Sequence, residues 1–152
     1  MLSVRDQAPA FSLPADSRGK ISLSVFKGKT LVLFFFPRAD TPGCTTEAGQ
    51  FRDIKKELDQ LGARVLGVSG DAVEQLRTFR EKYKLNFPLA GDTSHTMLEA
   101  YGVWKEKNLY GKKSMGIVRT TYIIDPEGKV RNVFPKVKVE GHAQEVLAAL
   151  RS

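Results

Sequence analysis

The chain has 152 residues, of which 41% are hydrophobic and 27% are charged, a balance typical of one globular domain covering residues 1–152. It holds no apolar run of about 18 residues and no signal-peptide pattern, which excludes a membrane-spanning helix and leads us to expect a cytoplasmic protein. Most of the net charge of +7 lies in residues 105–139, with nine Lys or Arg against three Asp or Glu, but these are dispersed and lack zinc-finger or RNA-binding motifs, which argues against nucleic acid as a partner.

The first half of the chain predicts a hairpin, a buried strand and a long helix. Residues 10–13 and 21–25 alternate apolar with polar side chains around a turn at 15–19, which is typical of a β-hairpin. The continuous apolar run 30–36 predicts a strand buried on both faces. After a polar loop at 38–43, an amphipathic helix of about four turns is expected. Its spacing is set by Ala48, Phe51, Ile54, Leu58 and Leu61, and Gly62 closes it.

The second half continues this alternation of strands and helices. The expected elements are a buried strand at 64–68, a helix at 72–83 with Asp71 as its N-cap, an edge piece at 87–90, a short helix at 94–101, a strand at 117–124, a turn at 125–128, a returning strand at 130–134 and a helix at 141–150. This order predicts an α/β fold with a mixed sheet covered by helices. In such a sheet a ligand site lies at the carboxyl end of a central strand, which here is the segment after residue 36.

The only cysteine, Cys44, falls in that segment, in or just before the first turn of the expected helix. A lone thiol in a reducing compartment is most often a small buried hydrophobic residue. At a helix N-terminus, however, free N–H groups and the helix dipole stabilise a thiolate. Thr41 can donate its hydroxyl to that thiolate, and Pro37 restricts the loop. Glu47, in the first helical turn, either caps the helix or orients a nearby arginine.

These residues resemble the active site of a known enzyme family. The spacing of Pro37, Thr41 and Cys44 matches the active-site pattern of peroxiredoxins, and the chain is similar to their bacterioferritin comigratory protein (PrxQ) branch. Three separated segments carry the resemblance, residues 8–11, 41–48 and 110–125, and the likeness covers essentially the whole chain.

The resemblance implies a thioredoxin-like fold with a central mixed β-sheet, flanking helices and an N-terminal hairpin. It also implies a thiol-dependent peroxidase with Cys44 as the peroxidatic nucleophile, acting on hydrogen peroxide and organic hydroperoxides in cell redox homeostasis. Arg119 is then expected to reach the active site from a neighbouring strand, beside Pro37 and Thr41, with Glu47 in support. PrxQ-type relatives are often monomeric, so a monomer is expected. No cofactor or metal is implied.

One position departs from the family pattern. Many PrxQ-type proteins carry a second cysteine five residues after the first, and here that position is Gly49. No resolving thiol can come from this chain, so the oxidised Cys44 must be reduced by an external thiol such as thioredoxin, glutaredoxin or a low-molecular-weight thiol. A Cys44–Cys44 disulfide between two chains stays as a less favoured alternative.

Two other functions remain open at this point, a redox sensor whose output is a partner interaction and a basic nucleic-acid-binding module in which Cys44 is incidental. The two histidines, His95 and His142, lack metal-ligand spacing and are expected in surface or capping roles. Phe87, Trp104 and Tyr110 are expected to fill the core rather than line a substrate pocket.

Overall fold

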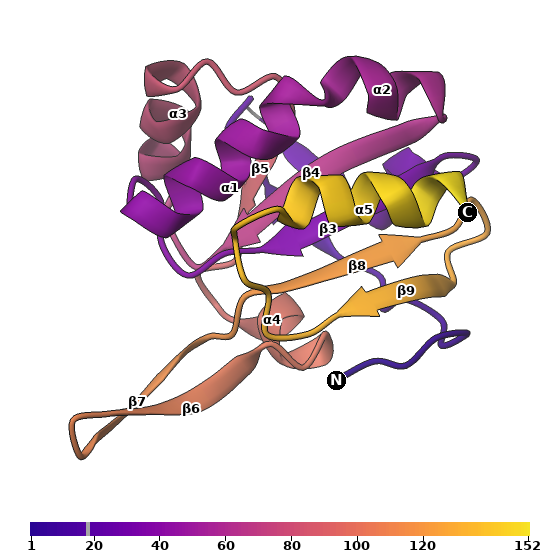
Figure 1. Ribbon diagram of the computed structural model, residues 1–152. Coiled ribbons are helices and arrows are strands. Elements are labelled where there is room, and N and C mark those ends of the chain that lie inside the picture. The colour runs from indigo at the N-terminus through magenta and orange to yellow at the C-terminus, as the bar shows by residue number, and fades with distance from the viewer. Residues whose placement is uncertain (18) are drawn as a thin grey trace.

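A computed structural model describes residues 1–17 and 19–152 of the chain. Its centre is a five-stranded sheet with the order β5–β4–β3–β8–β9 (Figure 1). The strands are β3 (Thr30–Phe35), β4 (Ala63–Ser69), β5 (Leu89–Gly91), β8 (Thr120–Ile124) and β9 (Val130–Phe134). Strand β3 pairs with β4 in parallel and with β8 antiparallel, so the expected mixed sheet is confirmed.

The central strand β3 is buried on both faces, as its apolar sequence predicts. Val32 and Phe34 belong to one hydrophobic cluster, whereas Leu31, Leu33 and Phe35 belong to the cluster on the other side of the sheet. Successive side chains of a strand point to opposite faces of the sheet, so the apolar side chains of this run are buried in the cores on both faces. The register of β3 in the sheet is therefore fixed, and this also fixes where the loop at its carboxyl end begins.

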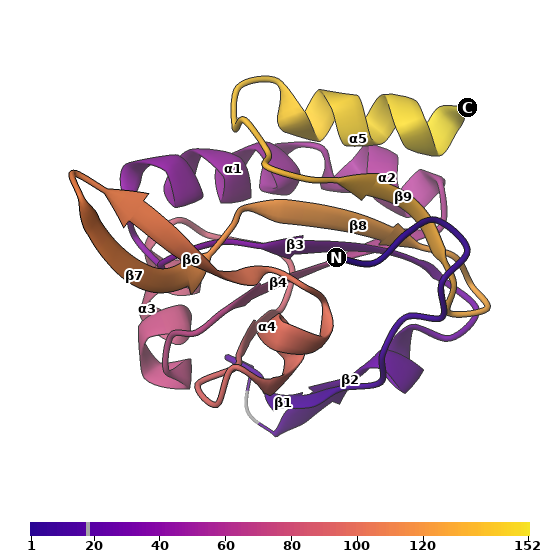
Figure 2. The ribbon, with the colours of Figure 1, turned by 90° about the horizontal axis from the view of Figure 1, so that it is seen from below.

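Helices cover both faces of the sheet, as Figure 2 shows. Helices α1 (Pro42–Asp53), α2 (Lys55–Gln60) and α5 (His142–Arg151) lie on one face. The other face carries α4 (Thr96–Ala100) and the expected N-terminal hairpin, β1 (Ser12–Pro14) with β2 (Lys20–Ser22). Helix α3 (Val73–Lys82) packs beside the edge strand β5. No helix in residues 1–17 and 19–152 is long and apolar enough to cross a membrane.

The N-terminal hairpin is shorter than predicted. The second apolar run was expected as a strand over 21–25, but the strand ends at Ser22 and the 3-10 helix η1 (Leu23–Phe26) follows. With three residues per turn, Leu23 and Phe26 point to the same side and both pack on the core, whereas Val25 is exposed. The expected turn at 15–19 includes Arg18, which lies outside the described residues.

The long helix predicted after the loop is divided in two. Ile54 leaves helical geometry with φ −105° and ψ 13°, and its amide donates to the carbonyl of Phe51 three residues back. Ile54 and Leu58 remain buried, so the apolar face that predicted one helix continues across the break. Gly62 then ends the segment with a φ of +70°, a conformation that glycine adopts without strain.

Helix α3 is not capped as predicted. Its N-cap is Ala72, whose amide donates to the Gln75 side chain, and not Asp71. The Asp71 carboxylate accepts instead from the amide of Ala39 at 2.7 Å and from the hydroxyl of Ser69 at 2.7 Å. It therefore fastens the loop after β3, a long-range contact that the local sequence does not show.

A second hairpin was missed, and with it a break in the strand expected over 117–124. Strand β6 (Trp104–Leu109) pairs antiparallel with β7 (Lys112–Ile117) and projects from the body of the fold (Figure 1). Tyr110 and Gly111 form its turn, both with positive φ. The chain then leaves β7, passes through Val118 and Arg119, and enters β8.

Candidate active site

Cys44 lies at the start of α1, just after the loop that follows β3, as predicted. Thr41 is the N-cap of α1, Pro42 is its first residue and Cys44 stands in its first turn. The amides of a first helical turn have no carbonyl within the helix to donate to, and they carry the positive end of the helix dipole. The thiol is only 1% exposed and packs in the cluster that contains Phe36 and Ala48.

Arg119 contacts both Cys44 and Glu47 through one guanidinium group. Its Nη2 donates to Cys44 Sγ at 3.3 Å, and its Nη1 donates to Glu47 Oε1 at 2.7 Å. Arg119 precedes β8, and β8 is the direct neighbour of β3, so the sheet brings together residues 75 positions apart. The geometry places Arg119 beside the thiol, where the resemblance expects it.

The close approach of Arg119 also involves Gly43. A β-carbon at Gly43 would lie 3.2 Å from Nη2 of Arg119, tighter than an ordinary contact. The absence of a side chain at this position therefore gives the guanidinium room to lie against the start of α1. The Arg119 side chain keeps 16% of its surface exposed, so solvent reaches the site at this residue.

Glu47 is fully buried and pairs with Arg119 rather than capping α1. Burial raises the pKa of Glu47 to about 7, against the opposing effect of the Arg119 charge. Among the described residues its second oxygen, Oε2, has no hydrogen-bond partner. Of the two roles that the sequence left open, the contacts support the one in which Glu47 orients an arginine.

Thr41 and Pro37 lie in the loop but do not touch the sulfur through a hydrogen bond. The hydroxyl of Thr41 donates to the carbonyl of Arg38 at 2.9 Å, and not to Cys44. Since its single proton is directed there, its oxygen lone pairs are left to accept a bond from an incoming molecule. Pro37 is half-buried at the start of the loop.

Two aspartates hold this loop onto its neighbours, and sequence reasoning missed both roles. Asp71 accepts the Ala39 amide, as described above. Asp40, with a φ of +59°, accepts from the ammonium of Lys82 at 2.8 Å and from the hydroxyl of Tyr83 at 2.5 Å. The loop is therefore fastened at two successive residues, Ala39 to the segment between β4 and α3, and Asp40 to the carboxyl end of α3. The local sequence signal is weak: aspartate is one of the few non-glycine residues that adopt left-handed backbone, which indicates a turn but not these partners.

The histidines and aromatic residues divide between surface and core. The surface or capping role expected for His142 is wrong, because its ring is buried, bonds Thr121 Oγ1 at 2.8 Å and lies 3.1 Å from a Glu145 oxygen. Burial lowers the pKa of His142. Phe87 fills the core as expected, whereas Tyr110 is fully exposed at the tip of the β6–β7 hairpin.

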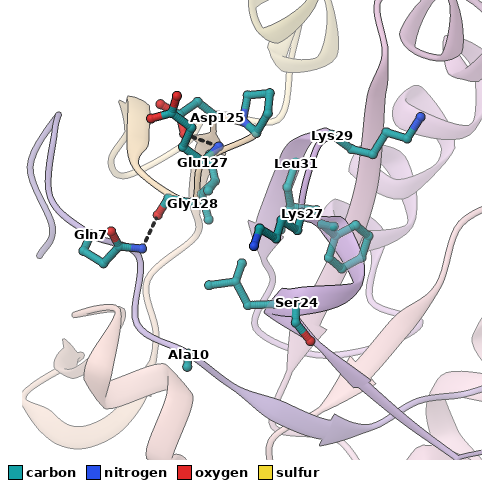
Figure 3. Close-up of a pocket in the computed structure, with 13 residues that line it drawn as sticks. Gln7, Ala10, Ser24, Lys27, Lys29, Leu31, Asp125, Glu127 and Gly128 are labelled. Carbon is teal, nitrogen blue, oxygen red and sulfur yellow. Dashed lines mark hydrogen bonds between the residues drawn. The ribbon is translucent and has the colours of Figure 1, made fainter.

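A cavity of about 240 Å³ lies at the other end of the sheet and does not include Cys44 (Figure 3). It opens between η1 and the turn joining β8 to β9, and Leu31, Phe26 and Ile124 form much of its apolar wall. Gln7 and Asp125 at this cavity are occupied by hydrogen bonds to backbone groups. The reactive groups of the chain are gathered instead at the carboxyl end of β3.

The arrangement around Cys44 suits nucleophilic attack by sulfur. Helix amides and a guanidinium stabilise negative charge on the thiolate and on an oxygen that leaves from it. Arg119 has further N–H groups, and a buried carboxyl holds the guanidinium in place. A small substrate that presents an electrophilic oxygen to the sulfur would meet these donors directly.

The profile of the AhpC/TSA family matches residues 4–133. The chain is 48% identical over 149 residues to a putative peroxiredoxin Bcp of Coxiella burnetii, covering 98% of this chain and 99% of that protein. Among solved structures, it is similar to a cysteine-to-serine variant of Xylella fastidiosa PrxQ, with a TM-score of 0.94 and 34% identity over 99% of this chain and 96% of the other.

The Xanthomonas campestris bacterioferritin comigratory protein, whose structures concern its alkyl peroxide reduction activity, is also similar. It has a TM-score of 0.89 and 42% identity, with 93% of this chain and 90% of that chain covered. The similarity extends over nearly the full length of all three relatives, and with it the thioredoxin-like fold is confirmed.

Proposed function

This chain belongs to the AhpC/TSA family, within its Bcp/PrxQ peroxiredoxins, and we propose that it works as a one-cysteine, thiol-dependent peroxidase whose reactive centre is Cys44. The observation that carries the proposal is the guanidinium of Arg119, which bonds Cys44 Sγ with one nitrogen and the buried Glu47 with another. Hydrogen peroxide and organic hydroperoxides are the proposed substrates.

The first half-reaction oxidises Cys44. Its thiolate attacks the distal oxygen of the hydroperoxide, an S–O bond forms and the O–O bond breaks. Cys44 becomes a sulfenic acid, and the departing alkoxide or hydroxide takes a proton and leaves as an alcohol or water. The sulfur is oxidised by two electrons and the peroxide is reduced by the same two.

Stabilisation of the leaving oxygen supplies the larger part of the rate in this account. Making a thiol fully ionised at neutral pH raises the nucleophile concentration only about thirtyfold, and a more acidic thiol is a weaker nucleophile. One preorganised donor to the developing charge is worth about 10²–10³ in rate. Arg119 and the first amides of α1 are the proposed donors, Thr41 accepts from the peroxide, and Pro37 keeps the loop in place.

The second half-reaction needs a thiol from another molecule, because Gly49 stands where many relatives have a second cysteine and the sequence contains no other. That thiol attacks the sulfenic sulfur, water leaves and a mixed disulfide forms. A second thiol then releases Cys44 as a thiol and leaves a disulfide. Thioredoxin, glutaredoxin or a low-molecular-weight thiol are the candidate reductants. We further propose a cytoplasmic monomer, working as one domain in cell redox homeostasis.

A turnover assay tests this function. Hydrogen peroxide and an organic hydroperoxide are each supplied in excess with thioredoxin, glutaredoxin or a small thiol, and peroxide consumption is followed. We expect many turnovers per chain with at least one reductant, and none for Cys44→Ser. Consumption that stops after one equivalent with every reductant would instead indicate a redox sensor.

A further inference from the structure

The β6–β7 hairpin carries a cation, Lys107, whose side chain lies along the strand that leads to Arg119. The hairpin leads directly to Arg119, since β7 ends at Ile117 and only Val118 intervenes. Lys107 lies on β6 opposite Ser114, in the middle of the hairpin. Its side chain is half-buried although the hairpin projects from the body of the fold.

Lys107 folds back toward the base of the hairpin along Gly116. The position that a β-carbon would take at Gly116 lies 3.3 Å from both Cδ and Cε of Lys107 and 3.6 Å from its Nζ. Gly116 is two residues closer to Arg119 than Ser114, the direct partner of Lys107. The ammonium group is therefore directed along β7 toward the end of the strand that leads to Arg119, and the missing side chain at Gly116 leaves room for it.

The charge of Lys107 has no acidic partner among the described residues. The nearby acids are used elsewhere, because Glu47 pairs with Arg119 and Glu106 lies 3.8 Å from Lys113. Burial lowers the pKa of Lys107 and the Arg119 charge lowers it further, whereas Cys44 raises it. The Lys107 ammonium therefore interacts electrostatically with both groups.

Oxidation of Cys44 changes the charge around this lysine. Before the reaction the thiolate offsets one positive charge at the site. The sulfenic acid is neutral, so the site becomes more positive by one unit as soon as the peroxide has been reduced. The sulfenic acid form of the site is therefore the form that attracts anions most strongly, and it is also the form that reacts with the reductant.

We propose that Lys107 forms an anion-binding subsite beside Cys44 that selects thiol reductants carrying a carboxylate. The inference rests on the proposed function, because it concerns the second half-reaction of the same thiol. The ligand class is a small thiol with a negatively charged group close to its sulfur. Its carboxylate would sit against the Lys107 ammonium while its thiolate attacks the sulfenic sulfur.

The test compares three thiols on pre-oxidised protein. Cys44 is first oxidised with one equivalent of hydrogen peroxide, and the rate of that step is recorded. The sulfenic acid is then reduced with 3-mercaptopropionate, 2-mercaptoethanol or cysteamine, at equal thiolate concentrations. These thiols carry an anionic, a neutral and a cationic group, so the ratio of their rate constants reports the charge preference.

We expect the carboxylate thiol to react fastest and the ammonium thiol slowest in the unmodified protein. Lys107→Gln should lower the ratio of the anionic to the neutral thiol by about threefold to tenfold, the size of a charge interaction in a half-exposed site. Lys112→Gln is the matched control, because it removes the same charge from an exposed position near the tip of the hairpin. It should leave the ratio as it is.

Three results would overturn the inference. They are an unchanged ratio in Lys107→Gln, an equal loss in Lys112→Gln, and a charge preference that appears with a carboxylate-bearing hydroperoxide but not with the thiols. Failure of the proposed function is visible separately, because Cys44 would then not be oxidised in the first step.

Discussion

The two ends of β3 differ in shape and in chemistry. At its amino end, around Leu31, an apolar cavity of about 240 Å³ opens between η1 and the β8–β9 turn. At its carboxyl end, the sulfur of Cys44 is almost fully covered and is contacted by Arg119, which Glu47 holds in place. An apolar hollow is a usual first choice for a ligand site, and here it lies at the end of β3 that is far from the thiol.

The difference shows which property marks the reactive end of this sheet. Only the carboxyl end combines a nucleophile, a helix N-terminus and a buried ion pair with a shifted carboxyl pKa. A hydroperoxide needs little space but strong donors, because the reacting group is two oxygen atoms. In this fold, charged groups clustered around a sulfur are therefore a better guide to the active site than a concave surface is.

The largest expected effect comes from changing Arg119. Arg119→Lys keeps the charge but loses the planar fork that bonds Cys44 and Glu47 together, so we expect oxidation of Cys44 to slow by about 10²-fold. Stopped-flow measurement with hydrogen peroxide gives the rate. Arg38→Lys, at an exposed arginine in the loop between β3 and α1, is the control. Oxidation at the unmodified rate in Arg119→Lys would remove this residue from the mechanism.

The next largest effect is the pH dependence that Glu47 gives to stability. Its pKa is raised in the fold from 4.5 to about 7, so the folded state holds this proton more tightly than the unfolded state does. The contribution of Glu47 is complete below pH 4.5 and is lost as the pH rises through 7.

Glu47→Gln should remove that dependence, which amounts to at most about 3 kcal/mol in the free energy of unfolding. Urea unfolding at several pH values between 4.5 and 8 measures it in both proteins. If the free energy of unfolding depends on pH in the same way in the unmodified protein and in Glu47→Gln, Glu47 does not titrate in this range.

Gly49 offers a smaller effect at the carboxyl end of β3. A β-carbon there would make only an ordinary contact, 3.5 Å from the Arg52 guanidinium. Gly49→Ala should therefore stabilise α1, raising the free energy of unfolding by about 1 kcal/mol without slowing Cys44 oxidation. Chemical denaturation and stopped-flow oxidation of one sample check both parts. A slower oxidation would mean that α1 must unwind during the reaction.

The smallest effect is expected at the amino end. Ala10 lines the cavity there, and Ala10→Leu places a larger apolar side chain in it. We expect the peroxidase rate to stay within about twofold of the unmodified protein, since a change remote from the reacting atoms leaves transition-state binding untouched. The same turnover assay measures it. A marked loss would show that the two ends of β3 act together.

Much of the fold is predictable because its core elements have strong apolar patterns. The run at 30–36 identifies the central strand, and the position of Cys44 after it follows from strand order alone. The β6–β7 hairpin escapes prediction because β7 is exposed along most of its length and carries no alternating apolar face. It is held by a turn at Tyr110 and Gly111 rather than by burial.

The site is predictable only in part, for a related reason. Cys44 and Thr41 lie three residues apart at the start of α1, whereas Arg119 is 75 residues from Cys44 and was placed by family resemblance. Its bond to Glu47 depends on the pairing of β3 with β8, which no local pattern encodes. The loop contact of Asp71 and the burial of His142 are likewise tertiary, and both expectations for these residues were wrong.

The fate of one oxygen atom shows whether Cys44 is the peroxidatic residue. The protein is treated with one equivalent of hydrogen peroxide, trapped with a sulfenic-acid reagent, and its intact and peptide masses are measured. We expect one trapped adduct per chain, located on Cys44, and a monomeric product. Oxygen found on a methionine such as the exposed Met115 with Cys44 unmodified, or a Cys44–Cys44 disulfide as the main product, would contradict this expectation.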